Sequence, residues 1–445
     1  MPKLAYRLYM LFVVSWFLHL PARVPFLGVL RFDLLLLLII SGLILTASDQ
    51  RTDARVSENS TQKYLLALIF YVIVTIPLVE WPGSVLKGGI ASFAKGVVFF
   101  FFTVRLIDTE KKLKAFVFVF LSCQVFRVLE PLYLHVTTGY WGSTAFMSGD
   151  YLDRLSGSPH DIVNPNGLAF VILTALPLLH FLCTLTSWGT LFYLGLAPPL
   201  VYALILTSSR SGLLGLVIVL LGFFYLSRHR VALLASVIIG FALIVPNLSP
   251  EQRDRYRSIF DDRAKNAPTV ELRMEGIKDD VKVIFHKPFV GHGLGTSREA
   301  NVNIGSSSLL AHNLYIEVGQ ELGLCGLAIF LCFMGSVLTN FLAVRKALEE
   351  TTPRTSSFLL ALANGGSVWL AMNILFSFFS YGLHGYEWYL FGGLSVVLNR
   401  LSTEQNHDVR APKKLKLLRV GPDSKLRPDG GLAGSGSARG RAPAS

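Results

Sequence analysis

The sequence predicts an all-α membrane protein that crosses the bilayer about twelve times, with one large helical extracytoplasmic loop between spans 9 and 10. Charged residues make up 16% of the 445 residues, against roughly 25% in a typical soluble protein. The mean hydropathy is +0.51. The chain is also a series of apolar runs of about 20 residues, the length that a helix needs to cross the hydrocarbon core.

The apolar runs define the candidate spans in chain order. No small-residue cleavage site follows Leu4–Leu20, so we expect this segment to remain as a span and not as a cleaved signal. The predicted spans are 4–20, 32–48, 64–80, 90–107, 115–135, 166–185, 189–207, 211–227, 231–247, 313–342, 357–376 and 382–399.

Lysine and arginine gather in alternate loops, and this asymmetry orients the spans. One side carries Lys3, Arg7, Arg51, Arg55, Lys63, Arg105, Lys111, Lys112, Lys114, Arg228, Arg230, Arg345, Lys346 and Arg354. The basic-rich side is the cytoplasmic one, so both termini are predicted to be cytoplasmic. The loop 248–311 is then extracytoplasmic.

The formal charge of +12 does not favour a nucleic-acid-binding protein, because the basic residues cluster at membrane edges. There they set topology or meet acidic membrane lipids. The four cysteines, Cys123, Cys183, Cys325 and Cys332, lie within apolar runs. Neither the cysteines nor the histidines His160, His286, His292 and His384 show metal-ligand spacing, so no metal site is expected.

The extracytoplasmic loop is predicted to contain two helices. Ser249-Pro250-Glu251 is typical of a helix start, and this helix would run to about Phe260 with Arg253 and Arg257 on one face. Apolar spacing predicts a second helix from about Thr269 to Phe285. A glycine-rich turn over 287–295 follows, and its glycines do not match a nucleotide-binding loop.

The chain divides into a membrane domain, 1–400, and a tail, 401–445. The tail is basic and then rich in Gly, Ala, Ser and Pro, which is typical of a disordered cytoplasmic segment. The membrane domain shows no internal repeat, which disfavours a transporter built from inverted halves.

Two polar elements flank the loop. Ser208-Ser209-Arg210-Ser211-Gly212 places an arginine at a break between spans, and Ala311-His312-Asn313 opens the next span. A permanently charged group and a titratable imidazole at a membrane boundary favour anion binding and proton transfer. The alternative interpretations are a snorkelling arginine and a helix-capping or interfacial histidine.

Several motifs in this order resemble the O-antigen ligase superfamily, which includes O-antigen polymerases and O-oligosaccharyltransferases. They are Arg154 with Asn164-Pro165-Asn166-Gly167, the Ser209–Gly212 turn, Lys287-Pro288 with Gly291-His292-Gly293-Leu294-Gly295, and His312-Asn313-Leu314-Tyr315 followed by Glu321–Leu327. The resemblance is strongest over about 150–340. The chain departs from the family's pattern at His292, where an apolar residue is usual, and at Met274 and Gly276 in the second helix.

The resemblance implies a GT-C-like glycosyltransferase of the bacterial inner membrane. Such an enzyme moves a glycan from undecaprenyl diphosphate to an acceptor hydroxyl, such as that of lipid A-core, on the periplasmic side. The resemblance implies that the reaction inverts the anomeric carbon. It also implies that the enzyme needs neither a metal nor another cofactor. The loop 248–311 would then be a lid over the site.

The chemistry assigns roles to particular residues. His312 is the expected general base and Arg210 the expected holder of the carrier diphosphate. Expected substrate-binding residues are Arg154, Arg273, Asn313, Arg253, Arg257 and Lys95, although each of these arginines could equally be solvated or structural. Glu317 and Glu321 are expected to hold the loop. Arg127 and Glu130 lie within a predicted span. They either have a functional role or form an ion pair with each other.

Two alternatives stay open. A polymerase or protein O-oligosaccharyltransferase of the same superfamily would use the same chemistry on another acceptor. A glycolipid transporter would bind the same anionic lipid without catalysis, and it would not require His312.

Overall fold

The computed structural model describes residues 2–46, 59–147, 150–226, 230–231, 235, 242, 246, 248–257, 268–305, 312–351, 357–380 and 382–410. The first part holds α1 (Pro2–Leu18), α2 (Leu20–Arg23), α3 (Pro25–Val29), α4 (Phe32–Thr46), α6 (Ser60–Thr75), η1 (Ile76–Leu78), α7 (Pro82–Ser84), η2 (Val85–Gly89), α8 (Ile90–Leu106), α9 (Glu110–Thr138), β1 (Gly142–Met147) and β2 (Asp150–Leu155). The second holds α10 (Pro165–Cys183), α11 (Ser187–Leu206), α12 (Arg210–Leu226), α14 (Pro250–Arg257), α15 (Pro268–His286), α16 (Ser297–Asn303), α17 (Leu314–Thr351), α18 (Phe358–Phe376) and α19 (Tyr386–Arg410).

Each predicted span except 231–247 coincides with a helix, and most of 231–247 lies outside the described residues. Among the described helices, seven segments are long and apolar enough to cross a membrane: Ser60–Leu78, Pro82–Leu106, Glu110–Thr138, Pro165–Cys183, Ser187–Leu206, Leu314–Glu350 and Phe358–Phe376. Phe32–Thr46 and Arg210–Leu226 are apolar but shorter. The chain is therefore a polytopic membrane protein, and the total of twelve spans stays a prediction.

Polar side chains cap several of these helices at their N-termini. The side-chain oxygens of Asn59, Thr109, Asn164 and Thr186 accept hydrogen bonds from backbone N–H groups in the first turns of α6, α9, α10 and α11. Such caps satisfy N–H groups that have no partner within the helix. The helix starts are therefore encoded locally, which explains their agreement with the predicted spans.

The all-α expectation is wrong at one place, because β1 and β2 form an antiparallel hairpin. Along β2, Tyr151 and Asp153 are exposed, whereas Leu152 and Arg154 are buried, as expected for a period of two. A ribbon of two six-residue strands is marginal in water without further packing. Its stability depends on neighbours that the local pattern does not reveal.

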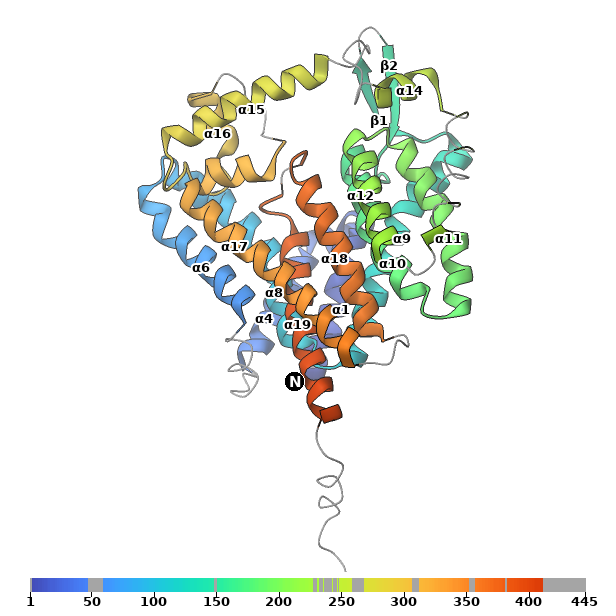
Figure 1. Ribbon diagram of the computed structural model, residues 1–445. Helices are drawn as coiled ribbons and strands as arrows, with labels where there is room; N and C mark the ends of the chain where they lie inside the picture. Colours follow the sequence, from blue (N-terminus) through green and yellow to red (C-terminus); the bar gives the residue numbers. More distant parts are fainter. Residues whose placement is uncertain are drawn as a thin grey trace, which may run out of the picture.

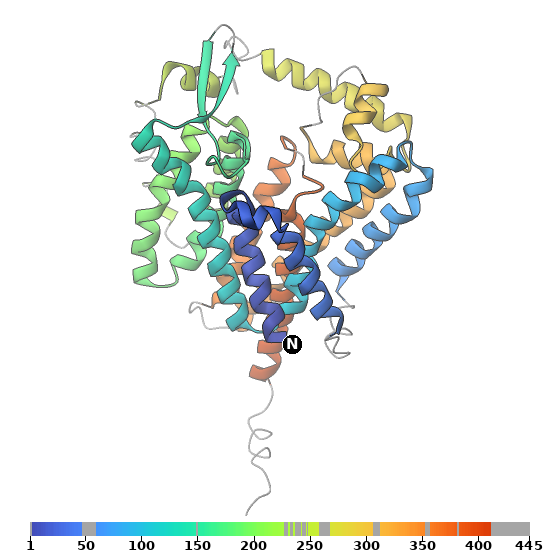
Figure 2. The ribbon, with the colours of Figure 1, turned by 180° about the vertical axis from the view of Figure 1, so that it is seen from behind.

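The helices form one bundle with a continuous apolar core (Figure 1). At its centre, α19 packs against α8 and α17, and Trp369 of α18 stacks on Phe391 of α19 with centroids 3.5 Å apart. Figure 2 shows α1 and α4 on the opposite face, where α1 also packs against α9. Large apolar side chains on the outside, such as Phe70 of α6 and Trp188 of α11, are exposed as expected for contact with lipid.

The described part of the predicted loop 248–311 contains the helices α14, α15 and α16, and they lie at one end of the bundle together with the hairpin (Figure 1). At the start of α14, Ser249 Oγ accepts from Gln252 N at 3.2 Å, and Gln252 Oε1 accepts from Ser249 N at 3.2 Å. This reciprocal pair is a capping box. The predicted second helix is confirmed as α15, which ends at His286 before the glycine-rich turn.

Helix α15 is held to α17 by a buried polar cluster. Asp280 Oδ1 accepts hydrogen bonds from Asn301 Nδ2 at 2.9 Å and from Gln320 Nε2 at 3.0 Å. Burial raises the pKa of Asp280, and these two hydrogen bonds oppose that shift. Beside the cluster, Ile284 packs on Ile316. Polar and apolar contacts together fix α15 over the start of α17.

Helix α19 continues to Arg410, beyond the predicted boundary at 400. Residues 411–445, where the rest of the predicted disordered tail falls, lie outside the described part of the chain.

Candidate active site

A sharp turn between α11 and α12 carries the predicted Arg210. Ser208 has a φ of 48°, in the left-handed region that residues other than glycine rarely adopt. Ser209 caps α12, since its Oγ accepts from Gly212 N at 3.1 Å. Arg210 is half-buried and is the first residue of α12. Strained backbone of this kind clusters at functional sites.

Arg154 reaches the same turn from β2. Its side chain is buried; Nε donates to Thr207 O at 2.9 Å and Nη2 donates to Asn166 Oδ1 at 2.9 Å. The Oγ of Ser209 donates to the same Asn166 oxygen at 2.9 Å. The structure therefore brings together Arg154, the Asn164–Gly167 motif and the Arg210 turn, which are separate in the sequence.

A further arginine at this turn was missed by the sequence prediction. Arg255 of α14 donates from Nε to Ser208 O at 2.6 Å, and Tyr256 OH donates to Ile205 O at 3.1 Å. The predicted Arg253 and Arg257 lie on the exposed face of α14 instead. Helical spacing shows which arginines share a face, but it does not show which face docks on the bundle.

His312 lies just before α17, and its side chain is exposed. Next to it, Asn313 is buried and caps α17: its Oδ1 accepts from Tyr315 N at 3.0 Å and from Ile316 N at 3.3 Å. The Asn313 oxygen, considered as a ligand for a sugar hydroxyl, is thus engaged in holding the helix start. This cap fixes the backbone beside His312.

The end of α18 lies against both helix starts. Leu314 N, two residues after His312, donates to Ser377 O at 2.8 Å. Gly215 of α12 lies against Phe376 of α18. A Cβ built on Gly215 would be 3.6 Å from Phe376 Cδ2. Residues 376–377 are therefore a common support for the segments that carry Arg210 and His312.

Glu321 binds the predicted loop, because it accepts from Gly295 N and Ser297 Oγ. Glu317 instead binds the loop between α18 and α19. Glu317 Oε2 accepts from Gly382 N at 2.7 Å and from Leu383 N at 3.1 Å. His384, in the same loop, places Nε2 3.5 Å from Glu321 Oε2. Burial lowers the pKa of the His384 imidazole, and the charge of Glu317 opposes that shift. The loop between α18 and α19 is thereby tied to α17.

The glycine-rich turn is tied to a break in α17. Gly323 has a φ of 67° and interrupts the helix, which exposes carbonyls that would otherwise accept bonds within it. The carbonyls of Gln320 and Glu321 accept from His292 N and Gly293 N, both at 2.9 Å. Glu321 also accepts from Gly295 N at 2.8 Å through its side chain.

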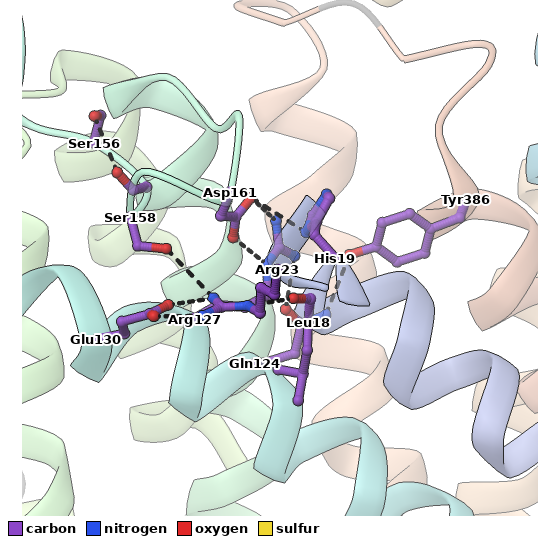
Figure 3. A network of polar contacts seen from close by, with 11 residues as sticks. Leu18, His19, Arg23, Gln124, Arg127, Glu130, Ser156, Ser158, Asp161 and Tyr386 are labelled. Atoms are coloured by element: carbon purple, nitrogen blue, oxygen red, sulfur yellow. Dashed lines mark hydrogen bonds and ion pairs between the residues drawn. The ribbon is translucent and has the colours of Figure 1, made fainter. Parts of the chain in front are cut away.

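A buried ionic network fixes the loop between β2 and α10 (Figure 3). Arg127 and Glu130 do not pair with each other. Arg127 donates from Nε to Asp161 Oδ2 at 2.6 Å and from Nη2 to Oδ1 at 3.1 Å, whereas Glu130 accepts from Arg23 Nη1 at 2.6 Å. Asp161 lies in the segment that joins Arg154 to Asn166. The network therefore fixes the segment that carries Arg154 and Asn166 to the candidate site.

We expect Arg127→Ala to destabilise the protein by about 3–5 kcal/mol, because it would leave the Asp161 carboxylate buried without its main partner. Arg127 and Asp161 are only 5% and 4% exposed. The measurement is the thermal unfolding midpoint in detergent. The double variant Arg127→Met/Asp161→Leu is the control and should recover most of the loss; a single variant as stable as the wild type would contradict the prediction.

The other predicted binding residues are not brought to the turn by any described contact. Lys95 is exposed on α8. Arg273 belongs to α15, and its side chain lies outside the described part. Among the predicted arginines, Arg154 donates to the backbone of the turn that leads into Arg210 at the start of α12.

Comparison with known proteins identifies the region around this turn. Residues 196–331 match the family model described as O-antigen ligase. The match includes the Arg210 turn, α14, α15, His312 and the kinked start of α17. Over these residues the chain is therefore similar to the O-antigen ligases. Arg154 and the Asn164–Gly167 motif lie outside the matched residues.

A curated relative supports the same class. The ComP-specific O-oligosaccharyltransferase of Acinetobacter baylyi is 27% identical over 198 residues, which covers 40% of this chain and 35% of that protein. The match thus spans about a third of the relative's length. The family model and the relative agree in naming ligases or transferases of glycans, and each matches only part of this chain.

Proposed function

We propose that this protein transfers a glycan from undecaprenyl diphosphate to an acceptor hydroxyl on the periplasmic side of the bacterial inner membrane, most simply to lipid A-core. One observation carries the proposal. Arg154, Arg210 and Arg255 come from three separate elements and meet at the turn over 207–210. The segments of Arg210 and His312 also share the support of α18.

The arginine cluster suits the donor. A diphosphate leaving group carries negative charge that guanidinium groups stabilise, and they do so more strongly in a site of low dielectric than in water. A guanidinium has five N–H donors, so it can hold a backbone carbonyl and a phosphate oxygen together. Ser208 Oγ, buried and without a hydrogen bond among the described residues, supplies a further donor beside them.

His312 suits the acceptor. In the proposed step its imidazole takes the proton of the acceptor hydroxyl while that oxygen forms a bond to the anomeric carbon. The bond from the anomeric carbon to the diphosphate oxygen breaks, and the diphosphate leaves with the electron pair, held by Arg210. Attack opposite to the leaving group inverts the anomeric centre, and the step needs no metal or other cofactor.

The remaining predicted residues would act around this centre. Arg253 and Arg257 are on α14, and Arg273 is on α15. There they would attract the anionic donor before it binds. Lys95 would serve the same purpose from α8. Asn313 would hold His312 in place through its cap on α17.

The proposed orientation follows from the arrangement of the ends. In Figure 1 the start of α1 and the end of α19 lie at the end of the bundle opposite to β1, β2, α14 and α15. Together with the basic loops, this favours cytoplasmic termini and a periplasmic site.

A protein acceptor is the second candidate, because the curated relative is named as an oligosaccharyltransferase specific for ComP. A polymerase, which would use another carrier-linked glycan as acceptor, is the third. All three have the same donor chemistry, and they differ in the group that enters beside His312.

We expect purified protein to release undecaprenyl diphosphate from carrier-linked glycan only when an acceptor is present, and lipid A-core to be that acceptor. The experiment supplies labelled donor alone, with lipid A-core, or with a pilin-like protein, and separates the products by gel and thin-layer chromatography. Polymer from donor alone would contradict ligation in favour of polymerisation. Glycosylated pilin without glycosylated lipid would favour the second candidate.

The transporter alternative is tested in sealed vesicles. Donor that crosses the membrane intact, with no cleavage of the sugar–phosphate bond in any of the three reactions, would overturn the proposed catalytic function.

A further inference from the structure

A cluster of metal-ligand side chains lies beside the glycine-rich turn, apart from the arginines. Glu80 follows η1, His286 ends α15, and His292 is in the turn itself. One candidate ligand atom from each lies within 4.8 Å of the other two. We propose that these three residues bind a divalent transition-metal ion of the zinc type. The proposal does not depend on the proposed function.

The hydrogen bonds of His292 point to a cation between His292 and Glu80. His292 is fully buried, and its Nε2 lies 2.9 Å from Val283 O, which can only accept, so Nε2 carries the hydrogen. A neutral His292 therefore directs the Nδ1 lone pair at Glu80 Oε2, 3.0 Å away. Two acceptors at this distance need a proton or a metal ion between them.

The third ligand favours the metal over the proton. His286 adds a ligand atom within 4.8 Å of those of Glu80 and His292, and its ring stacks on that of His292 with centroids 5.7 Å apart. A proton is shared between two acceptor atoms, whereas a zinc-type ion binds three or four ligand atoms. The bond from Nε2 to a backbone carbonyl is also the usual outer contact of a metal-bound histidine.

The backbone holds two of the ligands in place before any ion binds. Glu80 N donates to His292 O at 3.3 Å, and His292 N donates to Gln320 O at 2.9 Å. Glu80 and His286 are exposed, so their side chains can close to the separation of about 3.3 Å that tetrahedral zinc requires, and water can take the fourth position. Two imidazoles disfavour calcium and magnesium, which prefer oxygen ligands.

A bound ion would connect α15, the glycine-rich turn and the loop after α6. Of these segments, the glycine-rich turn lies against the kink at Gly323 in α17. We therefore assign the ion to fastening the extracytoplasmic helices onto the membrane domain. His312 and the arginine cluster lie outside its ligand set.

The competing explanation is a simple ion pair, since Lys287 Nζ lies 3.9 Å from Glu80 Oε2. The substitution Lys287→Gln separates the two. If a metal binds, removal of this competing cation leaves zinc affinity equal or higher. If the cluster exists only as an ion pair, Lys287→Gln lowers stability and zinc has no effect on any variant.

The test uses full-length protein purified without a histidine tag and stripped with chelator. We expect one zinc ion per chain by elemental analysis, a higher unfolding midpoint with ZnCl₂, and the visible absorption of tetrahedral cobalt with CoCl₂. Glu80→Gln and His286→Gln should each lower zinc affinity by about tenfold or more. His160→Gln, which alters an exposed histidine elsewhere, should leave affinity unchanged.

Two results would overturn the proposal. One is wild-type protein that binds no zinc after stripping. The other is zinc uptake by His286→Gln and Glu80→Gln equal to that of His160→Gln, which would mean adventitious binding only.

Discussion

Replacing His312 with alanine is expected to lower glycan transfer by about 10²–10⁴-fold, the usual contribution of a general base. Without the imidazole, the acceptor hydroxyl keeps its proton as it attacks and is a weak nucleophile. The rate of labelled product formation at saturating donor and acceptor measures the effect. Donor binding should change little, because the arginines at the turn over 207–210 remain.

The fold should survive this substitution. The His312 side chain is exposed, and the start of α17 is held by Asn313. Unfolding midpoints of the wild type and His312→Ala should therefore agree. His160→Ala is the matched histidine control and should transfer glycan at the wild-type rate. Full activity of His312→Ala would show that the base lies elsewhere.

Arg210→Ala is expected to reduce the transfer rate by about 10²–10³-fold, as for removal of one group that stabilises charge in a transition state. Negative charge grows on the diphosphate as its bond to the sugar breaks, so the loss should appear in kcat as well as in KM. Arg210→Lys should recover part of the rate, since it restores the charge without the bidentate geometry.

The other end of the same helix supplies the control. Arg230 is exposed beyond α12, where its guanidinium lies over Phe224. Arg230→Ala should leave transfer unchanged. If Arg210→Ala and Arg230→Ala had equal activity in detergent and in vesicles, Arg210 would be a membrane-edge arginine without a role in the reaction.

Local patterns were sufficient for much of the fold. Apolar runs predicted the helices because burial in lipid requires a helix with internally satisfied hydrogen bonds. The sequence Ser249-Pro250-Glu251 predicted the start of α14, where the structure has a capping box. Arg210 and His312 stood out because a charged or titratable group at a span boundary is rare.

Contacts between distant segments could not be predicted in this way. Arg255, not Arg253 or Arg257, docks on the Arg210 turn, and the choice depends on which face of α14 meets the bundle. The hairpin was missed because each strand is short and depends on its neighbours.

The sequence by itself determined a polytopic helical membrane protein, the order of its helices, and two residues suited to anion binding and proton transfer. These depend on hydropathy, capping and chemical type, which act over a few residues. Only the tertiary structure decided which arginines meet at the turn and that Glu80 faces His292 across 212 positions of sequence. Such contacts depend on how helices pack, and packing is a property of the whole bundle.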